Sequence, residues 1–268
     1  MEQPPEEPPR LDPFERLCEQ ARNLIDIDRA ADAIPLITQA LALAPDSAYA
    51  HCHLALAYVG QCNYGEALRL AVESLKRGPD YEWAHRLRSM NLRRMGAHRE
   101  AYEAALEARR LAPEEPLTLS CLYYAEMALY EAEESELRFA VLSDGGEMPP
   151  VPLPFGVPWR WLGRALESAR MLLDLAPDSA GAHRLMGEAL TAANRQDEAA
   201  ACFERALRIN PESPRALNQR GQLYLKEGRV WLALKLFTMA RTLAPTEPEY
   251  HMNVQLAQSR LKQGSWRP

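Results

Sequence analysis

The sequence lacks the motifs that mark several classes of enzyme and membrane protein. No serine lies in a G-x-S-x-G motif, and no glycine-rich loop precedes a helical pattern, which argues against hydrolase and phosphate-binding sites. No apolar run approaches the roughly 18 residues that a membrane helix needs. The chain begins MEQPPEEPPR, which is acidic and proline-rich, whereas a signal peptide begins basic and continues apolar. We therefore expect no enzymatic activity, no signal peptide and no membrane span.

Paired cysteines are also missing. The five cysteines are scattered, with no C-x-x-C pair, so neither a disulfide framework nor a zinc module is indicated. A reducing, cytoplasmic location fits this pattern, and the repeat-equivalent Cys18 and Cys52 are expected to be free thiols. The five cysteines are Cys18, Cys52, Cys62, Cys121 and Cys202.

Aromatic residues are scarce, at 7%, although hydrophobic residues make up 47% of the chain. This combination predicts cores of alanine and leucine, which suit closely stacked helices. The net charge is −6, and a negative chain is poorly suited to the phosphate backbone of nucleic acids. Arginine-rich ridges exist, but acidic residues neighbour them, so RNA binding is the least favoured class.

The chain does contain a repeat of thirty-four residues. One spacing of alanine, phenylalanine, alanine and proline occurs as Ala199, Phe203, Ala206 and Pro211, and again as Ala233, Phe237, Ala240 and Pro245. Prolines at 45, 79 and 113, and at 177, 211 and 245, each end a predicted helix because proline lacks the amide donor. Twelve residues before each proline stands an alanine, whose methyl group allows two helices to approach closely. These alanines are Ala33, Ala67, Ala101, Ala165, Ala199 and Ala233.

The A-x3-F…P spacing is typical of tetratricopeptide repeats, and the chain resembles that family. The first helices carry its L-G-x2-Y signature as Leu54-Ala55…Tyr58, Met186-Gly187…Leu190 and Arg220-Gly221…Tyr224. The resemblance implies an all-α, right-handed solenoid of helix-turn-helix units with a C-terminal capping helix. It also implies that the first helix of each unit lines a concave groove that accepts a protein or peptide.

The repeat divides the chain into a tail, one continuous solenoid and a second tail. Residues 1–13 are expected to be disordered, because their five prolines and three glutamates leave too little apolar surface to bury. The solenoid covers residues 14–262, with regular units at 14–47, 48–81, 82–115, 180–213 and 214–247 and a capping helix at 248–262. Residues 263–268 form the second tail.

The middle of the chain departs from the period and allows two interpretations. In the first, residues 116–147 form a degenerate unit, with Ser135 in the small position and Phe139 equivalent to Phe203. An incomplete unit at 148–179 follows, its first helix replaced by the proline-rich segment 148–158. In the second, residues 132–157 are one insertion between the two helices of a single unit. We prefer the first because Phe139 falls in register without adjustment.

Positions two, five, nine and twelve of each unit are expected to face the groove. In the first half of the chain they are mostly apolar, which predicts an interaction surface because exposed apolar residues rarely gather without a partner. These residues are Tyr49, Cys52, Leu56, Trp83, Met90, Leu117, Tyr124 and Met127, with Arg86 and Arg93 between them. In the second half they are polar and suited to hydrogen bonds: Arg184, Glu188, Arg215, Asn218 and Gln222. A register error of one position would instead place some of the apolar residues in the core.

Histidines 51, 85, 183 and 251 occupy one equivalent position in four units. Helix axes about 8–10 Å apart hold their nitrogens too far from one another to share a zinc ion at about 2.1 Å. Packing is therefore expected, and neither a metal nor another cofactor is predicted.

These patterns predict a non-catalytic adaptor or scaffold that binds a protein or peptide in the groove. Tyr49, Trp83 and Tyr124 would be the anchors, since rigid aromatic residues dominate binding hot spots. The alternative is a structural or autoinhibited module whose groove is occupied by its own residues 149–158. Related repeats hold acidic C-terminal tails with Lys, Asn, Asn, Lys and Arg, and this clamp is absent. The corresponding positions are Cys18, Arg22, His53, Trp83 and Leu87. The partner's identity and the oligomeric state are left open.

Overall fold

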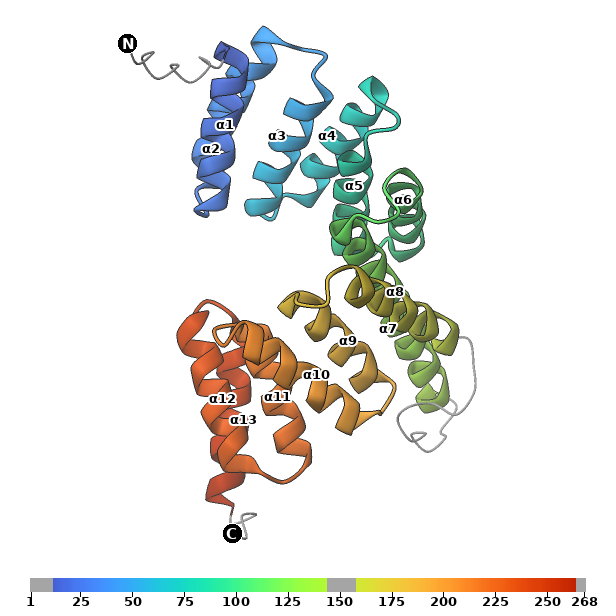
Figure 1. The fold of residues 1–268 in the computed structure, drawn as a ribbon, viewed down its shortest axis with the longest axis vertical. Helices are drawn as coiled ribbons and strands as arrows, with labels where there is room; N and C mark the ends of the chain where they lie inside the picture. Colours follow the sequence, from blue (N-terminus) through green and yellow to red (C-terminus); the bar gives the residue numbers. More distant parts are fainter. Residues whose placement is uncertain (1–11, 144–157, 264–268) are drawn as a thin grey trace, which may run out of the picture. The chain divides into compact units, whose positions relative to one another are not determined.

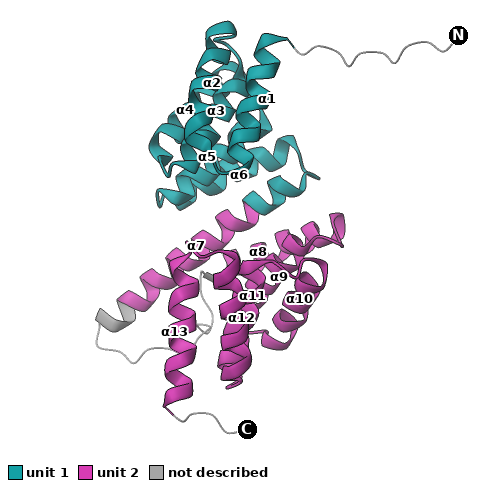
Figure 2. Ribbon diagram, turned by 90° about the vertical axis from the view of Figure 1, so that its left-hand side faces the viewer, with its two compact units in different colours: residues 1–121 teal, residues 122–268 magenta. Residues whose placement is uncertain are grey.

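The computed structural model describes residues 12–143 and 158–263, and within them the chain is helical and contains no strand (Figure 1). This confirms the predicted all-α class. The chain divides into two compact units, residues 1–121 and 122–268 (Figure 2). The division lies inside one helix, α7 (Pro116–Ser143). The continuity of the solenoid over residues 14–262 stays a prediction.

Unit 1 consists of three helix pairs and the start of α7. The pairs are α1 (Pro13–Asp26) with α2 (Ala30–Leu43), α3 (Ala48–Gly60) with α4 (Tyr64–Arg77), and α5 (Glu82–Arg94) with α6 (His98–Leu111). The first helices of successive pairs are also neighbours, since α1 contacts α3 and α3 contacts α5. This is the helix-turn-helix stacking that the period predicts.

Unit 2 continues the pattern after α7. Its helices are α8 (Pro158–Leu175), α9 (Ala180–Ala192), α10 (Gln196–Ile209), α11 (Pro214–Lys226), α12 (Val230–Leu243) and α13 (Pro248–Lys262). Helix α9 pairs with α10 and α11 with α12, and α13 packs on α12 through Val254 and Ala257. The bounds of α13 match the capping helix predicted at 248–262.

The helices begin and end where the sequence predicts. The hydroxyls of Ser47, Ser179 and Ser213 accept the backbone N–H three residues later, which satisfies one of the free amides at each helix start. At the other end, α2, α4, α6, α8, α10 and α12 each stop two residues before a proline of the period. The proline spacing therefore fixes the ends of the second helices.

Each second helix approaches its partner through the predicted small residue. All six alanines of the period are fully buried. In unit 2 the approach involves a second contact, in which Phe203 and Phe237 lie against Gly187 and Gly221. A Cβ added at either glycine would stand 2.7 Å from a phenylalanine ring carbon. Only glycine fits there, because the rings are fully buried and well packed.

The turn inside each regular pair contains a residue with positive φ, which is costly for most side chains. These residues recur at the repeat period and are Asp28, Cys62, Gly96, Asn194 and Gly228. The equivalent position after Gly96 is Tyr130, which lies inside α7. A bulky aromatic residue is poorly suited to a left-handed turn, so the helix continues where the other units turn. Residues 116–143 thus form one helix, and the degenerate helix-turn-helix unit predicted at 116–147 is wrong.

Phe139 shows the same error in register. It is 75% exposed, whereas Phe203 and Phe237, to which the sequence analysis equated it, are fully buried. The buried partner of α7 is α8, where the Ser168 hydroxyl donates to Glu126 at 2.8 Å. Helices α7 and α8 therefore pair with each other, as the second interpretation requires, but its insertion of 132–157 is too long because residues 132–143 belong to α7. The insertion and both tails, residues 144–157, 1–11 and 264–268, lie outside the described residues, so the predictions for them stay predictions.

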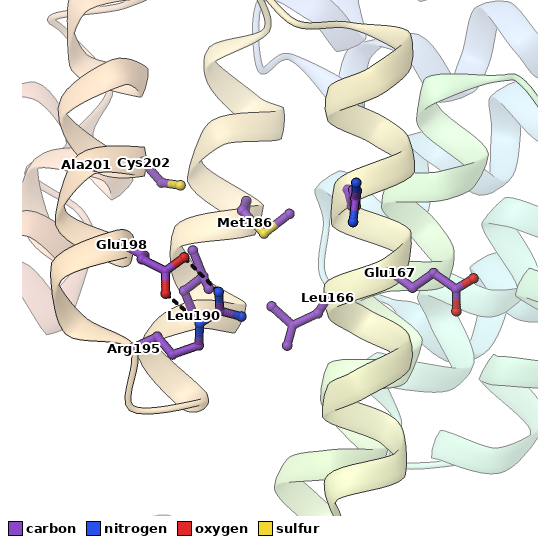
Figure 3. A pocket seen from close by; sticks show the side chains of 9 residues that line it. Leu166, Glu167, Met186, Leu190, Arg195, Glu198, Ala201 and Cys202 are labelled. Carbon is purple, nitrogen blue, oxygen red and sulfur yellow. Dashed lines mark hydrogen bonds and ion pairs between the residues drawn. The ribbon is translucent and has the colours of Figure 1, made fainter.

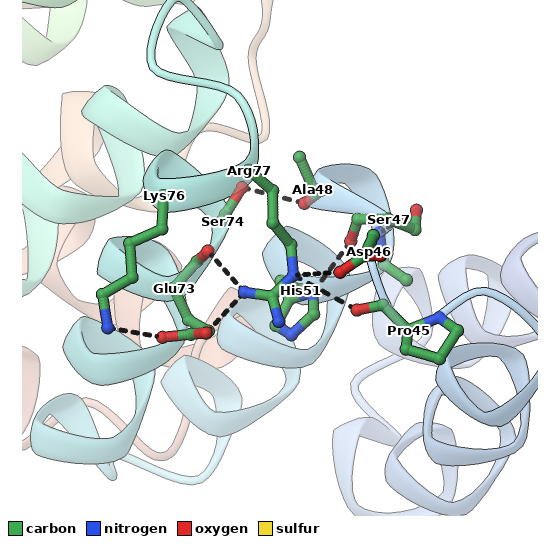
Figure 4. A network of polar contacts seen from close by, with 10 residues as sticks. Pro45, Asp46, Ser47, Ala48, His51, Glu73, Ser74, Lys76 and Arg77 are labelled. Carbon is green, nitrogen blue, oxygen red and sulfur yellow. Dashed lines mark hydrogen bonds and ion pairs between the residues drawn. The ribbon is translucent and has the colours of Figure 1, made fainter.

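Polar contacts tie successive pairs together, as Figure 4 shows for unit 1. The Ser74 hydroxyl of α4 donates to the backbone oxygen of Ala48 at 2.9 Å. Arg77 donates from Nε to the Pro45 oxygen at 3.2 Å and forms an ion pair with Glu73. The second helix of one pair thus holds the loop that follows the previous pair.

The four equivalent histidines close the turns between pairs. The Nε2 atoms of His85, His183 and His251 lie 2.9, 2.9 and 2.8 Å from the backbone oxygens of the prolines six residues earlier. Since a carbonyl oxygen only accepts, Nε2 carries the proton and donates in each case. His51 makes the variant contact, from Nδ1 to the Ser47 oxygen at 2.8 Å. All four histidines thus make a turn-closing hydrogen bond, but only His51 and His85 are buried as the predicted packing role requires, and His251 is exposed.

Alanine at Gly221 tests the close approach. Gly221→Ala should lower the free energy of unfolding by about 1–2 kcal/mol, because the overpacking penalty exceeds the gain in helix propensity. Gly163→Ala is the matched control, since a Cβ there meets nothing within 4 Å. It should raise stability by up to about 1 kcal/mol. Urea denaturation followed by circular dichroism measures both, and equal shifts in the two variants would contradict the contact.

Candidate functional site

The first helices of unit 1 carry a cluster of rings at the predicted groove positions. Tyr49 on α3 is 38% exposed and Trp83 on α5 is half-buried, with ring centroids 6.0 Å apart. The His53 ring lies between them, at 4.4 Å from Tyr49 and 4.8 Å from Trp83, edge-on to both. Tyr81 packs edge-on against Trp83 at 6.2 Å. The two predicted anchors thus belong to one braced aromatic cluster.

His53 is the residue that the sequence analysis missed. It is 3% exposed, and neither ring nitrogen has a hydrogen-bond partner among the described residues. Burial, and after it the positive charge of Arg22, lowers the pKa of His53 to about 4. The signal was its position one helical turn after Tyr49, where two side chains on a helix meet. His53 therefore acts as a neutral ring that fixes Tyr49 and Trp83.

The other apolar groove residues of unit 1 vary in exposure. Leu56 and Met90 are half-buried and pack on the core that α1 to α5 share, and Leu117 at the start of α7 is 57% exposed. Arg86 forms an ion pair with Glu82 of its own helix, and Arg93 is half-buried. These side chains are partly accessible, but Arg86 is already paired.

Cys52 does not belong to the surface. It is fully buried, and its Sγ lies 3.3 Å from the Ser74 hydroxyl of α4. Burial raises the pKa of the Cys52 thiol to about 12. The prediction that Cys52 contacts a partner is wrong, because position five of this helix faces the second helix of its own pair.

In unit 2, the predicted residues of α7 and α9 form one polar cluster. Arg184 donates from Nη2 to the Tyr124 hydroxyl at 2.8 Å and from Nη1 to Glu188 at 2.5 Å. Burial raises the pKa of Glu188, and the charges of Arg184 and Arg215 oppose that shift. Met127 lies half-buried one turn along α7 from Tyr124. The structure therefore brings Tyr124, Arg184 and Glu188 together.

The predicted residues of α11 contact the capping helix. Asn218 is 2% exposed, donates to Glu249 at 2.8 Å and accepts from Asn253 at 2.8 Å. Gln222 donates to the same Glu249 oxygen at 3.1 Å, whereas Arg215 is exposed. The prediction that Asn218 contacts a partner in the groove is wrong, because its amide nitrogen and its amide oxygen are both hydrogen-bonded to α13.

Residues 12–143 and 158–263 contain no group of three His, Cys, Asp or Glu side chains that could hold a metal ion. None of the described helices is both long and apolar enough to cross a membrane. The autoinhibitory segment proposed from the sequence, 149–158, lies almost wholly outside the described residues, so that alternative stays a prediction.

Family comparisons agree with the helix pairs. The family model "Tetratricopeptide repeat" matches residues 18–82 in unit 1, and the model "TPR repeat" matches residues 187–228 in unit 2. Together with the stacked pairs, these matches identify the chain as a tetratricopeptide-repeat protein. Proteins of this family generally mediate protein–protein interactions and are generally not enzymes. No curated protein matches the sequence.

Solved tetratricopeptide-repeat structures share the fold. TTC0263, a thermophilic TPR protein from Thermus thermophilus, is 21% identical over 79% of this chain and 99% of its own, with a TM-score of 0.65. PilF of Pseudomonas aeruginosa is 16% identical over 90% of this chain and 96% of its own, with a TM-score of 0.61. A monomeric IFIT1 mutant with Gppp-AAAA is 16% identical over 94% of this chain and 57% of its own, with a TM-score of 0.75. At these identities the likeness shows the fold alone.

The buried His53 predicts a pH dependence of stability. Its pKa in the folded protein is below the ordinary value of about 6.5, so the unfolded chain binds more protons between pH 6.5 and 4. The contribution of His53 is therefore complete above pH 6.5 and declines as the pH falls towards 4. In His53→Phe this decline should be absent, because phenylalanine keeps a ring in the cluster without a titrating nitrogen.

Urea denaturation of wild type and His53→Phe at pH 7 and pH 5 measures the difference. The wild type should lose more stability between the two pH values than the variant does. Parallel losses in the two proteins would mean that His53 does not titrate in this range.

Proposed function

We propose that the chain is a non-catalytic adaptor that holds a segment of a partner protein against the first helices of unit 1. The observation that carries the proposal is the partly exposed pair of Tyr49 and Trp83, braced by His53. Rings that are already held in place lose little conformational entropy when a ligand covers them. A braced aromatic pair is therefore a suitable binding hot spot.

The surroundings of the rings indicate the chemistry of the bound segment. Leu56 and Met90 extend the apolar surface, and the exposed Arg22 of α1 places a cation near Tyr49 and His53. Arg86 is engaged by Glu82, so Arg22 replaces it in our proposal as the residue that meets an acidic group. The partner segment would present an apolar side chain next to a carboxylate.

Unit 2 would supply a second, polar contact. The exposed Arg215 lies beside the cluster of Tyr124, Arg184 and Glu188, and Gln222 is only half-buried. Such a surface suits hydrogen bonds to a peptide backbone or to polar side chains. This contact would add specificity more than affinity.

Trp83→Ala tests the proposal. Affinity purification from cells of the native organism, with mass spectrometry of what co-elutes, identifies a partner, and its affinity is then measured with purified proteins. Trp83→Ala should weaken that affinity about thirtyfold, the effect of a hot-spot loss of about 2 kcal/mol. Trp231→Ala is the control, since Trp231 is 59% exposed on α12, which is a second helix of unit 2.

Circular dichroism must show that Trp83→Ala keeps its helical content. Equal affinities of the wild type and a folded Trp83→Ala variant would refute the proposed surface.

A further inference from the structure

A second surface of unit 2 has its own chemistry. A hollow of about 520 Å³ lies between the second helices α10 and α12, with two residues of α11 also lining it. Its apolar lining is Leu207, Leu232, Leu236 and Met239. Its basic residues are Arg208, Arg220 and Lys235, which come from α10, α11 and α12. Apolar and basic side chains therefore line the same hollow, which suits an amphipathic ligand.

Arg220 is a buried cation in this hollow. The residue is 6% exposed, and its Cζ lies 3.8 Å from the centroid of the Tyr224 ring. Nη2 donates to Glu204 and Nη1 to Glu227, both at 3.0 Å, whereas the buried Nε has no hydrogen-bond partner among the described residues. Burying a guanidinium is costly unless it is paired, and Glu204 and Glu227 supply that pairing.

The rim then carries positive charge in excess. Arg208 and Lys235 are exposed, and neither forms an ion pair within the described part of the chain. Arg229 adds a further cation. Its Cζ lies 4.7 Å from the Tyr224 ring centroid, and its Nη1 forms an ion pair with Glu227 at 3.5 Å. Four cations therefore meet two carboxylates, which leaves two positive charges on a chain whose net charge is −6. Such a patch attracts anionic groups.

The equivalent hollow one repeat earlier shows that this charge is not a property of the repeat. That hollow, of about 610 Å³ between α8, α9 and α10, appears in Figure 3. Met186 stands where the later hollow has Arg220, and Ala201 stands where it has Lys235. Arg195 is neutralised by Glu198 through two hydrogen bonds of 2.7 Å. The cationic lining is thus specific to the hollow between α10 and α12.

We propose that the hollow between α10 and α12 binds an acidic, amphipathic helical segment of a partner protein. A carboxylate of the segment would lie between Arg208 and Lys235, and its apolar side chains would cover Leu232, Leu236 and Met239. A protein segment fits better than RNA. Tyr224 is the only aromatic residue of the lining, and its ring is already in contact with two guanidinium groups, so no free stacking platform is present.

The probe is a fluorescein-labelled helical peptide with leucine on one face and glutamate on the other. Its fluorescence anisotropy should rise with the full-length chain, and added salt should weaken the binding. The same peptide with lysine in place of glutamate should not bind. The double variant Arg208→Glu, Lys235→Glu should bind the glutamate peptide at least about tenfold more weakly, because two charge-assisted contacts become repulsive.

A matched control variant locates the site. Arg170→Glu changes an exposed cation of the earlier hollow and should leave the affinity unchanged. Circular dichroism checks that the double variant is folded. The proposal fails if the glutamate peptide does not bind, if the lysine peptide binds equally well, or if the folded double variant retains full affinity. It also fails if a single-stranded RNA oligonucleotide binds this surface and the peptide does not.

Discussion

The structure depends on how closely the two helices of each pair approach each other. Six fully buried alanines, one in each second helix, allow that approach, and a larger side chain at any of them would push the pair apart. Gly187 and Gly221 extend the same constraint to the first helices, where buried phenylalanine rings occupy the space of a missing Cβ. Closely packed pairs bring successive first helices into contact, and that contact assembles the ring cluster of Tyr49, His53 and Trp83.

Much of the fold could be predicted because the decisive residues recur at a fixed period. The prolines end the second helices, the alanines mark the pair interface, and α13 has the predicted bounds. The middle of the chain could not be placed in this way. Phe139 has the spacing from Pro113 that the repeat period predicts, but the period says nothing about the residue in the turn between the two helices of a unit. At that turn position Tyr130 stands where a left-handed conformation is needed. The backbone requirement at that one position decided the length of α7.

The candidate site could be predicted only in outline. Tyr49 and Trp83 lie on the expected helices and are partly exposed, but Cys52 and Asn218 are buried, although a helical wheel places them on the same face. Their burial depends on neighbours far along the chain, Ser74 for one and Asn253 for the other, which periodicity does not identify. His53 was missed because its role comes from the two rings beside it and not from a motif.

The buried Asn218 gives the last helix a second purpose. Helix α13 covers apolar surface, but through Glu249 and Asn253 it also provides both hydrogen-bond partners of the Asn218 amide. A shortened chain that stopped after α12 would leave that amide without them, at a cost beyond the loss of apolar cover. Additional repeats grafted in place of α13 would meet the same requirement. The junction between α11 and α13 is therefore held by matched hydrogen bonds as well as by apolar contact.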